Sequence, residues 1–200
     1  KDINPSNIVL NPATGDLKLI DFGIATQLAQ TEPLPQPPTQ LEGTLAYLSP
    51  EQTGRMNRIV DYRTDFYSLG ITFYHLLTGR LPFVTDDLLE LVHSHLAKLP
   101  IPPVELNPSI PTVLSDLVLK LLAKDAEDRY QSAAGILADL ESCLSSWQST
   151  GQISLIPLAT QDFTGQLQIP QKLYGREMEV AQLLAAYERV AKSDLQDAEF

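Results

Sequence analysis

Stretches of apolar residues at helical spacing occupy much of the chain. Residues 64–79 are apolar almost all round, which predicts a buried central helix that ends at Gly79. Each of the other stretches carries a single apolar stripe with polar residues on the opposite face. These stripes predict amphipathic helices over residues 86–98, 112–124 and 132–147.

Two short runs of β-branched and aliphatic residues precede these helices. The runs "NIVL" and "LKLI" flank the sequence "NPATGD", whose Asn-Pro and Thr-Gly-Asp steps are typical of a turn. The pattern predicts a β-hairpin. Because antiparallel strands meet at the end away from the turn, we expect Asn7, which enters the first strand, beside Asp21, which leaves the second. Asp2 lies in the turn before the hairpin and is expected to face the same space.

Charged and ionisable side chains on the predicted helices have simple interpretations. Lys124 is expected in the last turn of its helix, where the helix dipole favours a cation. His93 and His95 are two residues apart, so on a helix they point to different faces and form a poor metal pair. We therefore expect both histidines to face solvent.

The composition limits the class of protein. The chain has 200 residues, of which 44% are hydrophobic and 20% are charged, which is typical of a globular protein. A net charge of −11 argues against nucleic acid or an anionic membrane as the main partner. The single cysteine excludes an intramolecular disulfide and fits a reducing compartment. With no signal peptide and no apolar run long enough to span a bilayer, we expect a cytoplasmic location.

The predicted hairpin gathers oxygen-bearing side chains that suit a metal–phosphate site. Mg²⁺ prefers oxygen ligands and is commonly held by one or two carboxylates together with substrate phosphates. Asn7 and Asp21 could hold such an ion, and Asp2 would be available for proton transfer. Alternatively, each of these residues could serve only as turn chemistry or as a cap. However, "D-x-x-x-x-N" followed after a hairpin by "DFG" resembles the catalytic and magnesium loops of protein kinases.

Further motifs extend this resemblance downstream. "EGTLAYLSPE" resembles the segment that closes a kinase activation loop, "DYRTDFYSLG" resembles the start of the long central helix, and "KDAEDRYQSA" resembles the stretch that supplies a structural arginine. The resemblance implies an α+β, protein-kinase-like fold, with residues 1–147 forming a mainly helical C-terminal lobe and the β-hairpin lying at the catalytic cleft. The N-terminal lobe, with its glycine-rich loop and ATP-pairing lysine, is expected upstream of residue 1.

The kinase resemblance assigns roles to the residues of the site. Asp2 would accept the proton of the substrate hydroxyl or orient that hydroxyl for attack on the γ-phosphate. Asn7 and Asp21 would hold Mg²⁺, which bridges the phosphates of ATP. Thr44 would form a hydrogen bond near Asp2 and help to place the protein substrate. The resemblance thus implies Mg²⁺-ATP-dependent phosphorylation of Ser or Thr residues.

Three more residues are given supporting roles by the resemblance. Glu51 and Arg129 would form a partly buried, bidentate ion pair that anchors the activation loop. The alternative is an exposed salt bridge that contributes about 0–1 kcal/mol. Asp65 is either an ordinary helix cap or, as in kinases, an acceptor that pins the backbone of the catalytic loop.

One departure from the kinase pattern bears directly on catalysis. The second residue after the catalytic Asp is usually a Lys that reaches the transferred phosphate, and here it is Asn4. An amide donates a hydrogen bond but does not neutralise developing charge, so transfer could be slow or absent. Two hypotheses therefore follow: an active Ser/Thr kinase, or a pseudokinase that serves as a regulatory scaffold. Small-molecule kinases often lack this Lys as well, but they do not share the "GTLAYLSPE" substrate platform.

A second departure concerns the activation loop. Lys1 stands where an Arg normally precedes the catalytic Asp and binds a phosphate on this loop. Lys can bind phosphate as a point charge, without a bidentate fork. The loop is rich in proline and offers Thr26, Thr31 and Thr39 as candidate phosphorylation sites.

The composition changes after Trp147. Residues 148–172 are rich in Gln, Ser, Thr and Gly, which predicts a linker. Residues 173–200 begin with "LYGREMEVAQLL", which resembles the start of AAA-type and STAND-type ATPase domains; the alternative is an ordinary amphipathic helix. A kinase followed by such a domain resembles the large multidomain sensor kinases of bacteria, including hybrid histidine kinases. The other domains of such a parent chain would then be its partners.

Overall fold

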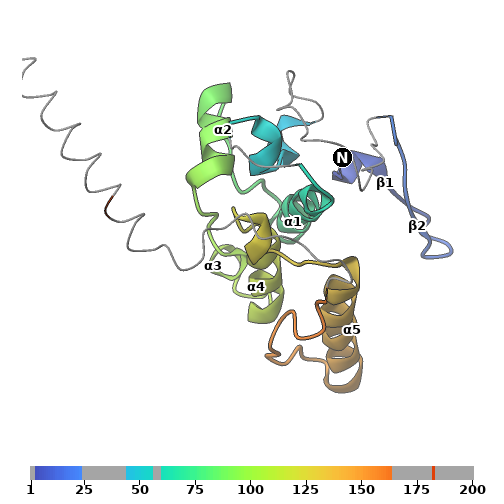
Figure 1. Ribbon diagram of the computed structural model, residues 1–200. Coiled ribbons are helices and arrows are strands. Elements are labelled where there is room, and N and C mark those ends of the chain that lie inside the picture. Colours follow the sequence, from blue (N-terminus) through green and yellow to red (C-terminus); the bar gives the residue numbers. More distant parts are fainter. Residues whose placement is uncertain (1–2, 24–43, 56–59, 164–181, 183–200) are drawn as a thin grey trace, which may run out of the picture. The chain divides into compact units, whose positions relative to one another are not determined.

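The computed structural model describes residues 3–23, 44–55, 60–163 and 182 (Figure 1). The chain divides into two compact units, residues 1–166 and residues 167–200. The elements of the first unit include the α-helices α1 (Arg63–Thr78), α2 (Leu88–Ala97), α3 (Pro103–Leu106), α4 (Thr112–Leu121) and α5 (Ala133–Thr150), and the strands β1 (Ile8–Leu10) and β2 (Leu17–Leu19). Short 3₁₀ turns are η1 (Pro5–Asn7), η2 (Leu45–Tyr47), η3 (Pro50–Thr53) and η4 (Ala126–Asp128). The described part is therefore mostly helical with one small sheet.

The predicted hairpin is confirmed. Strands β1 and β2 pair antiparallel, with Ile8 opposite Leu19. The turn between them is closed by hydrogen bonds in which the Asn11 N–H donates to the Asp16 carbonyl at 2.8 Å and the Gly15 N–H donates to the Asn11 carbonyl at 2.8 Å. The Asn-Pro and Gly-Asp steps thus form the turn that their residue types favour.

The central helix α1 is confirmed, and its neighbours form the first hydrophobic cluster. Tyr67, Ile71 and Tyr74 of α1 are buried together with residues of α4 and of the following turn, such as Val118. The helix ends at Gly79, whose φ of 72° is left-handed and whose N–H donates to the His75 carbonyl. Glycine adopts this conformation without a steric penalty, which is why it commonly ends helices.

The prediction that α1 is apolar almost all round was wrong. Thr64, Ser68 and Thr72 lie four residues apart on one face, and each is at most 1% exposed. These hydroxyls are buried because each has hydrogen-bond partners from other parts of the chain, described below. Periodicity marks which faces are apolar, but a small hydroxyl residue is buried at little cost when it is hydrogen-bonded.

Helices α4 and α5 pack through a second cluster. Leu117, Leu121, Tyr130 and Ile136 are buried here. The predicted ends of these helices differ from the observed ones. Helix α4 ends at Leu121, so Lys124 lies beyond its last turn, and α5 continues past residue 147 to Thr150. Frayed or extended ends of this kind do not alter the apolar stripe on which the helix prediction rested.

His93 is exposed as predicted, but the prediction that His95 faces solvent was wrong. His95 is 1% exposed, and its Nδ1 lies 3.1 Å from the Tyr67 hydroxyl. The Lys124 ammonium donates to the His95 carbonyl at 2.9 Å and lies over the Phe83 ring. Burial, followed by the positive charge of Lys124, lowers the pKa of His95 from 6.5 to about 4. The imidazole is therefore neutral at physiological pH.

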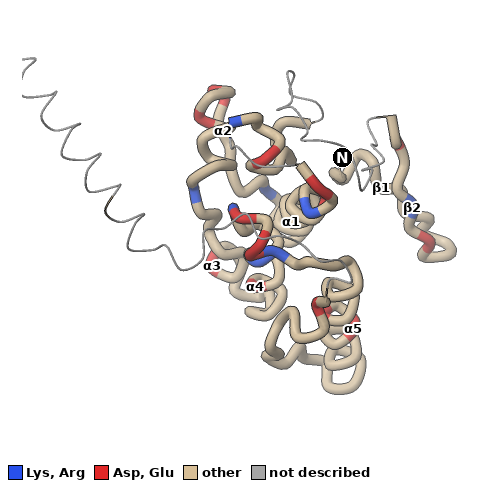
Figure 2. The backbone as a smooth tube through the Cα atoms, in the orientation of Figure 1, with Lys and Arg blue, Asp and Glu red and all other residues tan. Residues whose placement is uncertain are grey.

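Charges are spread over the described chain. Figure 2 shows Asp and Glu on several elements, with the fewer Lys and Arg residues lying among them. Among the described residues, no helix has both the length and the apolar composition that crossing a membrane requires.

Candidate active site

The outer end of the hairpin brings two predicted metal ligands to the same place. The Ile20 N–H donates to the Asn7 carbonyl at 2.9 Å, so Asn7 and the residue before Asp21 are joined directly. Asp21 is exposed and has a φ of 60°, which is uncommon for a residue other than glycine. Its carboxylate accepts a hydrogen bond from the Gly23 N–H at 3.1 Å. Asp adopts this left-handed conformation more readily than most residues that have a side chain.

Asn4 has a structural role that the sequence did not predict. Its side chain is buried, and its Oδ1 accepts a hydrogen bond from the Ser6 N–H at 2.9 Å. Asn4 thereby caps η1, the turn that leads into β1. The side chain at this position is thus engaged by the backbone two residues ahead.

Residues 44–54 form a short platform built on two 3₁₀ turns. Thr44 is exposed and immediately precedes η2. Ser49 begins η3 with a capping box, in which its backbone N–H donates to the Gln52 side chain at 3.0 Å. Ser49 and Glu51 are both almost fully buried. The first residue of the platform is therefore exposed, whereas Ser49 and Glu51 near its other end are buried.

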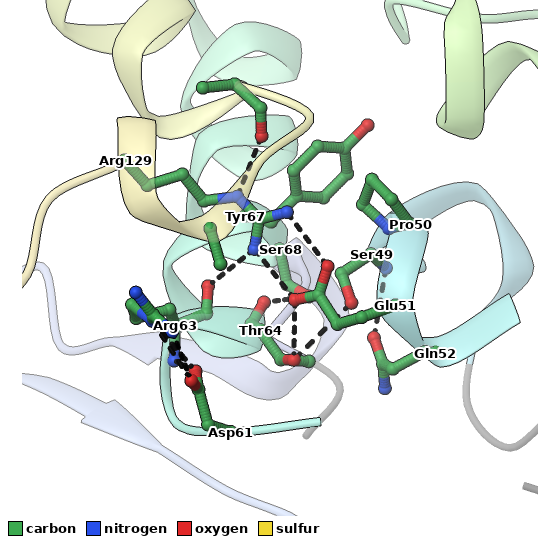
Figure 3. A network of polar contacts seen from close by, with 12 residues as sticks. Ser49, Pro50, Glu51, Gln52, Asp61, Arg63, Thr64, Tyr67, Ser68 and Arg129 are labelled. Carbon is green, nitrogen blue, oxygen red and sulfur yellow. Dashed lines mark hydrogen bonds and ion pairs between the residues drawn. The ribbon is translucent and has the colours of Figure 1, made fainter. Parts of the chain in front are cut away.

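A buried ion pair anchors this platform to the segment before α5 (Figure 3). The Arg129 guanidinium donates to both oxygens of Glu51, with Nη1–Oε1 at 2.7 Å and Nη2–Oε2 at 2.9 Å. The two side chains are 0% and 4% exposed. Burial alone would raise the pKa of the Glu51 carboxyl, but the hydrogen bonds and charge of Arg129 outweigh it and lower the pKa below its ordinary value. The structure thus brings the two predicted residues into a bidentate pair.

Arg129 also organises the backbone around it. Its Nε donates to the Ala123 carbonyl at 2.8 Å, Nη2 to the Lys124 carbonyl at 3.0 Å, and Nη1 to the Arg63 carbonyl at 3.2 Å. The guanidinium carbon lies 5.0 Å from the centre of the Tyr67 ring. Burying the charge is tolerable because its donors are paired and the aromatic face is favourable.

The hydroxyls of α1 connect the parts of the site. The Thr64 hydroxyl donates to Glu51 Oε1 at 2.8 Å, and the Ser68 hydroxyl donates to the Tyr47 carbonyl at 2.9 Å (Figure 3 labels Thr64, Glu51 and Ser68). The Thr72 hydroxyl donates to the Ile3 carbonyl at 3.1 Å. These three residues, which we call the hydroxyl ladder, were missed from the sequence. The signal that could have found them is the spacing of Ser and Thr at i, i+4 and i+8.

Asp65 was predicted to be either the cap of the central helix or an acceptor for the backbone of the catalytic loop. The N-cap position of α1 is Tyr62, so Asp65 lies inside the first turn and is not the cap. The Thr72 hydroxyl of α1 also contacts the backbone that leads into the hairpin, at the Ile3 carbonyl. The role of Asp65 as an acceptor for this loop stays a prediction.

The remaining predicted residues lie outside the described part of the chain. These are Lys1, Asp2, Thr26, Thr31 and Thr39. Among the described residues, no group of three or more His, Cys, Asp or Glu side chains could hold a metal ion.

Comparisons with known proteins show which family the chain resembles. The sequence profile of the protein kinase domain matches residues 1–139. The chain is 42% identical over 169 residues to Hybrid signal transduction histidine kinase G of Dictyostelium discoideum, covering 74% of this chain and 5% of that protein. It is 42% identical over 140 residues to Serine/threonine-protein kinase PknB of Mycobacterium leprae (70% and 22% covered) and 38% identical over 146 residues to Probable serine/threonine-protein kinase CPE1738 of Clostridium perfringens (70% and 20%). The chain thus spans less than a quarter of the length of each of these relatives. From the match to more than half of its residues, the chain belongs to the protein kinase family.

Proposed function

We propose that this chain supplies the catalytic half of a Mg²⁺-ATP-dependent kinase that phosphorylates Ser and Thr residues of proteins. The observation that carries the proposal is the hairpin end, where the Ile20 N–H donates to the Asn7 carbonyl beside Asp21. Similarity to two serine/threonine-protein kinases supports the substrate class.

The donors at the hairpin end fit Mg²⁺. Asn7 offers an amide oxygen and Asp21 an exposed carboxylate, and both are hard oxygen ligands of the kind this ion prefers. When bound, the ion neutralises charge on the phosphates of ATP during transfer. The positive φ of Asp21 supports this role, because the conformation turns the chain back so that the Gly23 N–H can orient the carboxylate.

The protein's other groups would position the substrate and move its proton. Asp2 would accept the hydroxyl proton, and the adjacent Ile3 carbonyl is fixed by the Thr72 hydroxyl. A base gains catalytic advantage from fixed orientation, so a fixed neighbour in the chain supports this role. Thr44, exposed at the start of the platform, would contact the protein substrate, while the Glu51–Arg129 pair holds the far end of that platform.

The test is transfer of labelled γ-phosphate by the complete kinase domain. Wild type, Asp2→Asn and the control Asp16→Asn are compared with a Ser/Thr peptide and Mg²⁺. Asp16 lies in the exposed turn of the hairpin, where the Thr14 hydroxyl donates to its carboxylate at 2.8 Å. We expect transfer by wild type and Asp16→Asn and loss in Asp2→Asn. Equal transfer by all three proteins would contradict the proposal.

A second candidate function, a pseudokinase scaffold, is favoured by one observation. Asn4 occupies the position of the usual phosphate-contacting Lys, and its side chain is buried while capping η1. A scaffold would bind Mg²⁺-ATP without transfer. If wild type shows binding only, Asn4→Lys is the next variant: transfer gained by Asn4→Lys would mean that the missing charge alone prevents catalysis.

We also propose that the chain belongs to a multidomain, cytoplasmic signalling protein, in which residues 173–200 begin an ATPase domain of the AAA or STAND type. The similarity to a hybrid signal transduction histidine kinase supports this context. Within the activation loop, Thr26, Thr31 and Thr39 would accept phosphate and Lys1 would bind it. Phosphopeptide mapping of active protein that finds all three threonines unmodified would contradict the loop proposal.

A further inference from the structure

The segment after α5 folds back along that helix. The Ser146 hydroxyl donates to the Gln152 carbonyl at 2.9 Å, and the Ala159 N–H donates to Asp139 Oδ2 at 2.8 Å. Later positions in the segment thus meet earlier positions in α5, so residues 151–163, which we call the return segment, run antiparallel to the helix. Figure 1 shows this segment in orange beside α5. The kinase-domain match ends before it, at residue 139.

Apolar and polar contacts both fix the return segment. Leu158 and Ala159 pack against the second hydrophobic cluster. Asp139 is buried and accepts hydrogen bonds from the Ala159 N–H and the Tyr130 hydroxyl. Ala159 has a φ of 60°, which a residue with a side chain adopts only when its surroundings demand it. The segment is therefore held in one conformation at this point.

Asp162 makes the contact that matters most for the site. Its carboxylate accepts hydrogen bonds from the Gln131 N–H at 2.6 Å and from the Ser132 hydroxyl at 2.8 Å. Ser132 is the N-cap of α5, so the carboxylate also lies near the positive end of a helix. It lies so close to α5 that a Cβ added to Gly135 would be 2.5 Å from the Asp162 carboxylate. Gly135 leaves the space that Asp162 occupies.

Gln131 connects Asp162 to the anchor of the platform. Its side-chain amide donates to the Arg129 carbonyl at 2.7 Å, and its Oε1 accepts from Arg63 Nη1 at 2.8 Å. The Arg63 carbonyl in turn accepts from Arg129 Nη1, which also bonds Glu51. Gln131 is thus bonded to Arg129 directly, through the Arg129 carbonyl, and indirectly, through Arg63.

We propose that Asp162 is a positioning residue for the substrate platform, and that the return segment is part of the working kinase unit. By holding Gln131 and Ser132, Asp162 fixes the turn that carries Arg129, and Arg129 fixes the end of the platform. The role in substrate binding rests on the proposed kinase function. The hydrogen-bond path itself does not, so the two can be tested separately.

The first test compares Asp162→Ala, the conservative Asp162→Asn and the control Asp116→Asn in the complete protein. Asp116 is exposed on α4. Hydrogen bonds to charged groups are stronger than those to neutral groups. In Asp162→Ala, protection of the Gln131 amide from hydrogen exchange should therefore fall about 10- to 100-fold relative to protection of the Ile71 amide in α1. The fall should be smaller in Asp162→Asn, which keeps an acceptor. An equal fall at both amides means global unfolding and would overturn the proposal, as would unchanged protection.

The kinetic readout separates positioning from general support. In Asp162→Ala, KM for a peptide substrate should rise about 2- to 30-fold, the usual range for coupled positions, while KM for ATP stays constant. Asp162→Asn should restore most of the peptide KM. A change in KM for ATP alone, or no change in either, overturns the positioning role. If wild type transfers no phosphate, the kinase proposal fails and the exchange result alone decides the inference.

A steric variant gives an independent test. Gly→Ala inside a helix is normally stabilising, but in Gly135→Ala the new methyl group would collide with Asp162. We expect Gly135→Ala to lower the melting temperature of the complete protein in the wild-type background and to raise it in the Asp162→Gly background, which removes both the carboxylate and the Cβ of Asp162 that lie 2.5 and 2.7 Å from the added Cβ. A rise in both backgrounds would show that Asp162 is not held against α5 and would overturn the proposal.

Discussion

Removing either partner of the Glu51–Arg129 pair should destabilise the kinase domain, but by unequal amounts. Glu51→Gln keeps the shape of the side chain and one acceptor oxygen, and it leaves Arg129 with its three backbone carbonyl partners. Arg129→Met removes the charge and leaves a buried carboxylate together with those three carbonyls. The matched pair of variants therefore separates the cost of an unpaired charge from the cost of unsatisfied backbone groups.

The magnitudes follow from burial. Breaking a buried ion pair by removing one partner costs about 3–5 kcal/mol, and each buried carbonyl left unsatisfied costs about 1–3 kcal/mol more. We expect Glu51→Gln to lose about 3 kcal/mol and Arg129→Met at least about 2 kcal/mol more than that. Because domains are stable by only about 5–15 kcal/mol, Arg129→Met should leave much of the protein unfolded.

The assay is urea unfolding of the complete kinase domain, followed by circular dichroism, for wild type, both single variants and the double variant Glu51→Gln/Arg129→Met. The double variant should be less destabilised than the sum of the singles, because neither charge is left unpaired. The pKa of Glu51 is lowered, so its contribution is present above its ordinary pKa of 4.5 and is lost as pH falls through the folded value. Equal losses below about 1 kcal/mol for both single variants, as for an exposed pair, would refute the reasoning.

Three further predictions concern other parts of the molecule. The pKa of His95 is about 4 when folded and 6.5 when unfolded, so the unfolded chain binds the proton first and stability should fall by about 3 kcal/mol as pH drops from 6.5 to 4. The urea midpoint of unfolding should depend much less on pH over this range in His95→Gln than in wild type. An unchanged pH dependence in His95→Gln would exclude His95 as its source. Asp21→Asn should raise the Mg²⁺ concentration for half-maximal transfer about tenfold or more, since a ligand charge is lost; a Mg²⁺ titration with Asp16→Asn as control measures this, and matching curves would contradict it. Thr72→Val removes the donor to the Ile3 carbonyl and should lower kcat with little change in KM for ATP; an unchanged kcat would mean that this bond does not orient the catalytic loop.

The sequence predicted the elements better than it predicted what their polar residues do. Apolar period and turn residues identified the hairpin and the long helices, because these signals are local. The Glu51–Arg129 pair joins residues 78 positions apart, so only the kinase resemblance could suggest it. The burial of His95 also depends on a distant partner, Tyr67, and no local pattern reveals it.

The amino-acid composition did not predict that the return segment packs against α5. Its Ser, Thr, Gln and Gly content predicts a linker, and such residues do favour flexible chain. What fixes the described residues 151–163 is a few specific partners, chiefly Asp139 in α5 and Gln131 in the turn before it. A polar segment docks when its few polar groups find buried partners, and a sequence read residue by residue cannot show where those partners lie.

The hydroxyl ladder of α1 has a consequence for how this region tolerates change over evolution. Four residues advance a helix by about 6 Å, so Thr64, Ser68 and Thr72 lie at regular intervals along α1. The spacing of these hydroxyls therefore determines where Glu51, the Tyr47 carbonyl and the Ile3 carbonyl contact the helix. Exchanging Ser for Thr preserves the interval. Inserting or deleting one residue within the ladder rotates all later side chains by about 100° and breaks the contacts that tie the Ile3 carbonyl and the platform to the same helix. The length of this stretch of helix is therefore more tightly constrained than its composition.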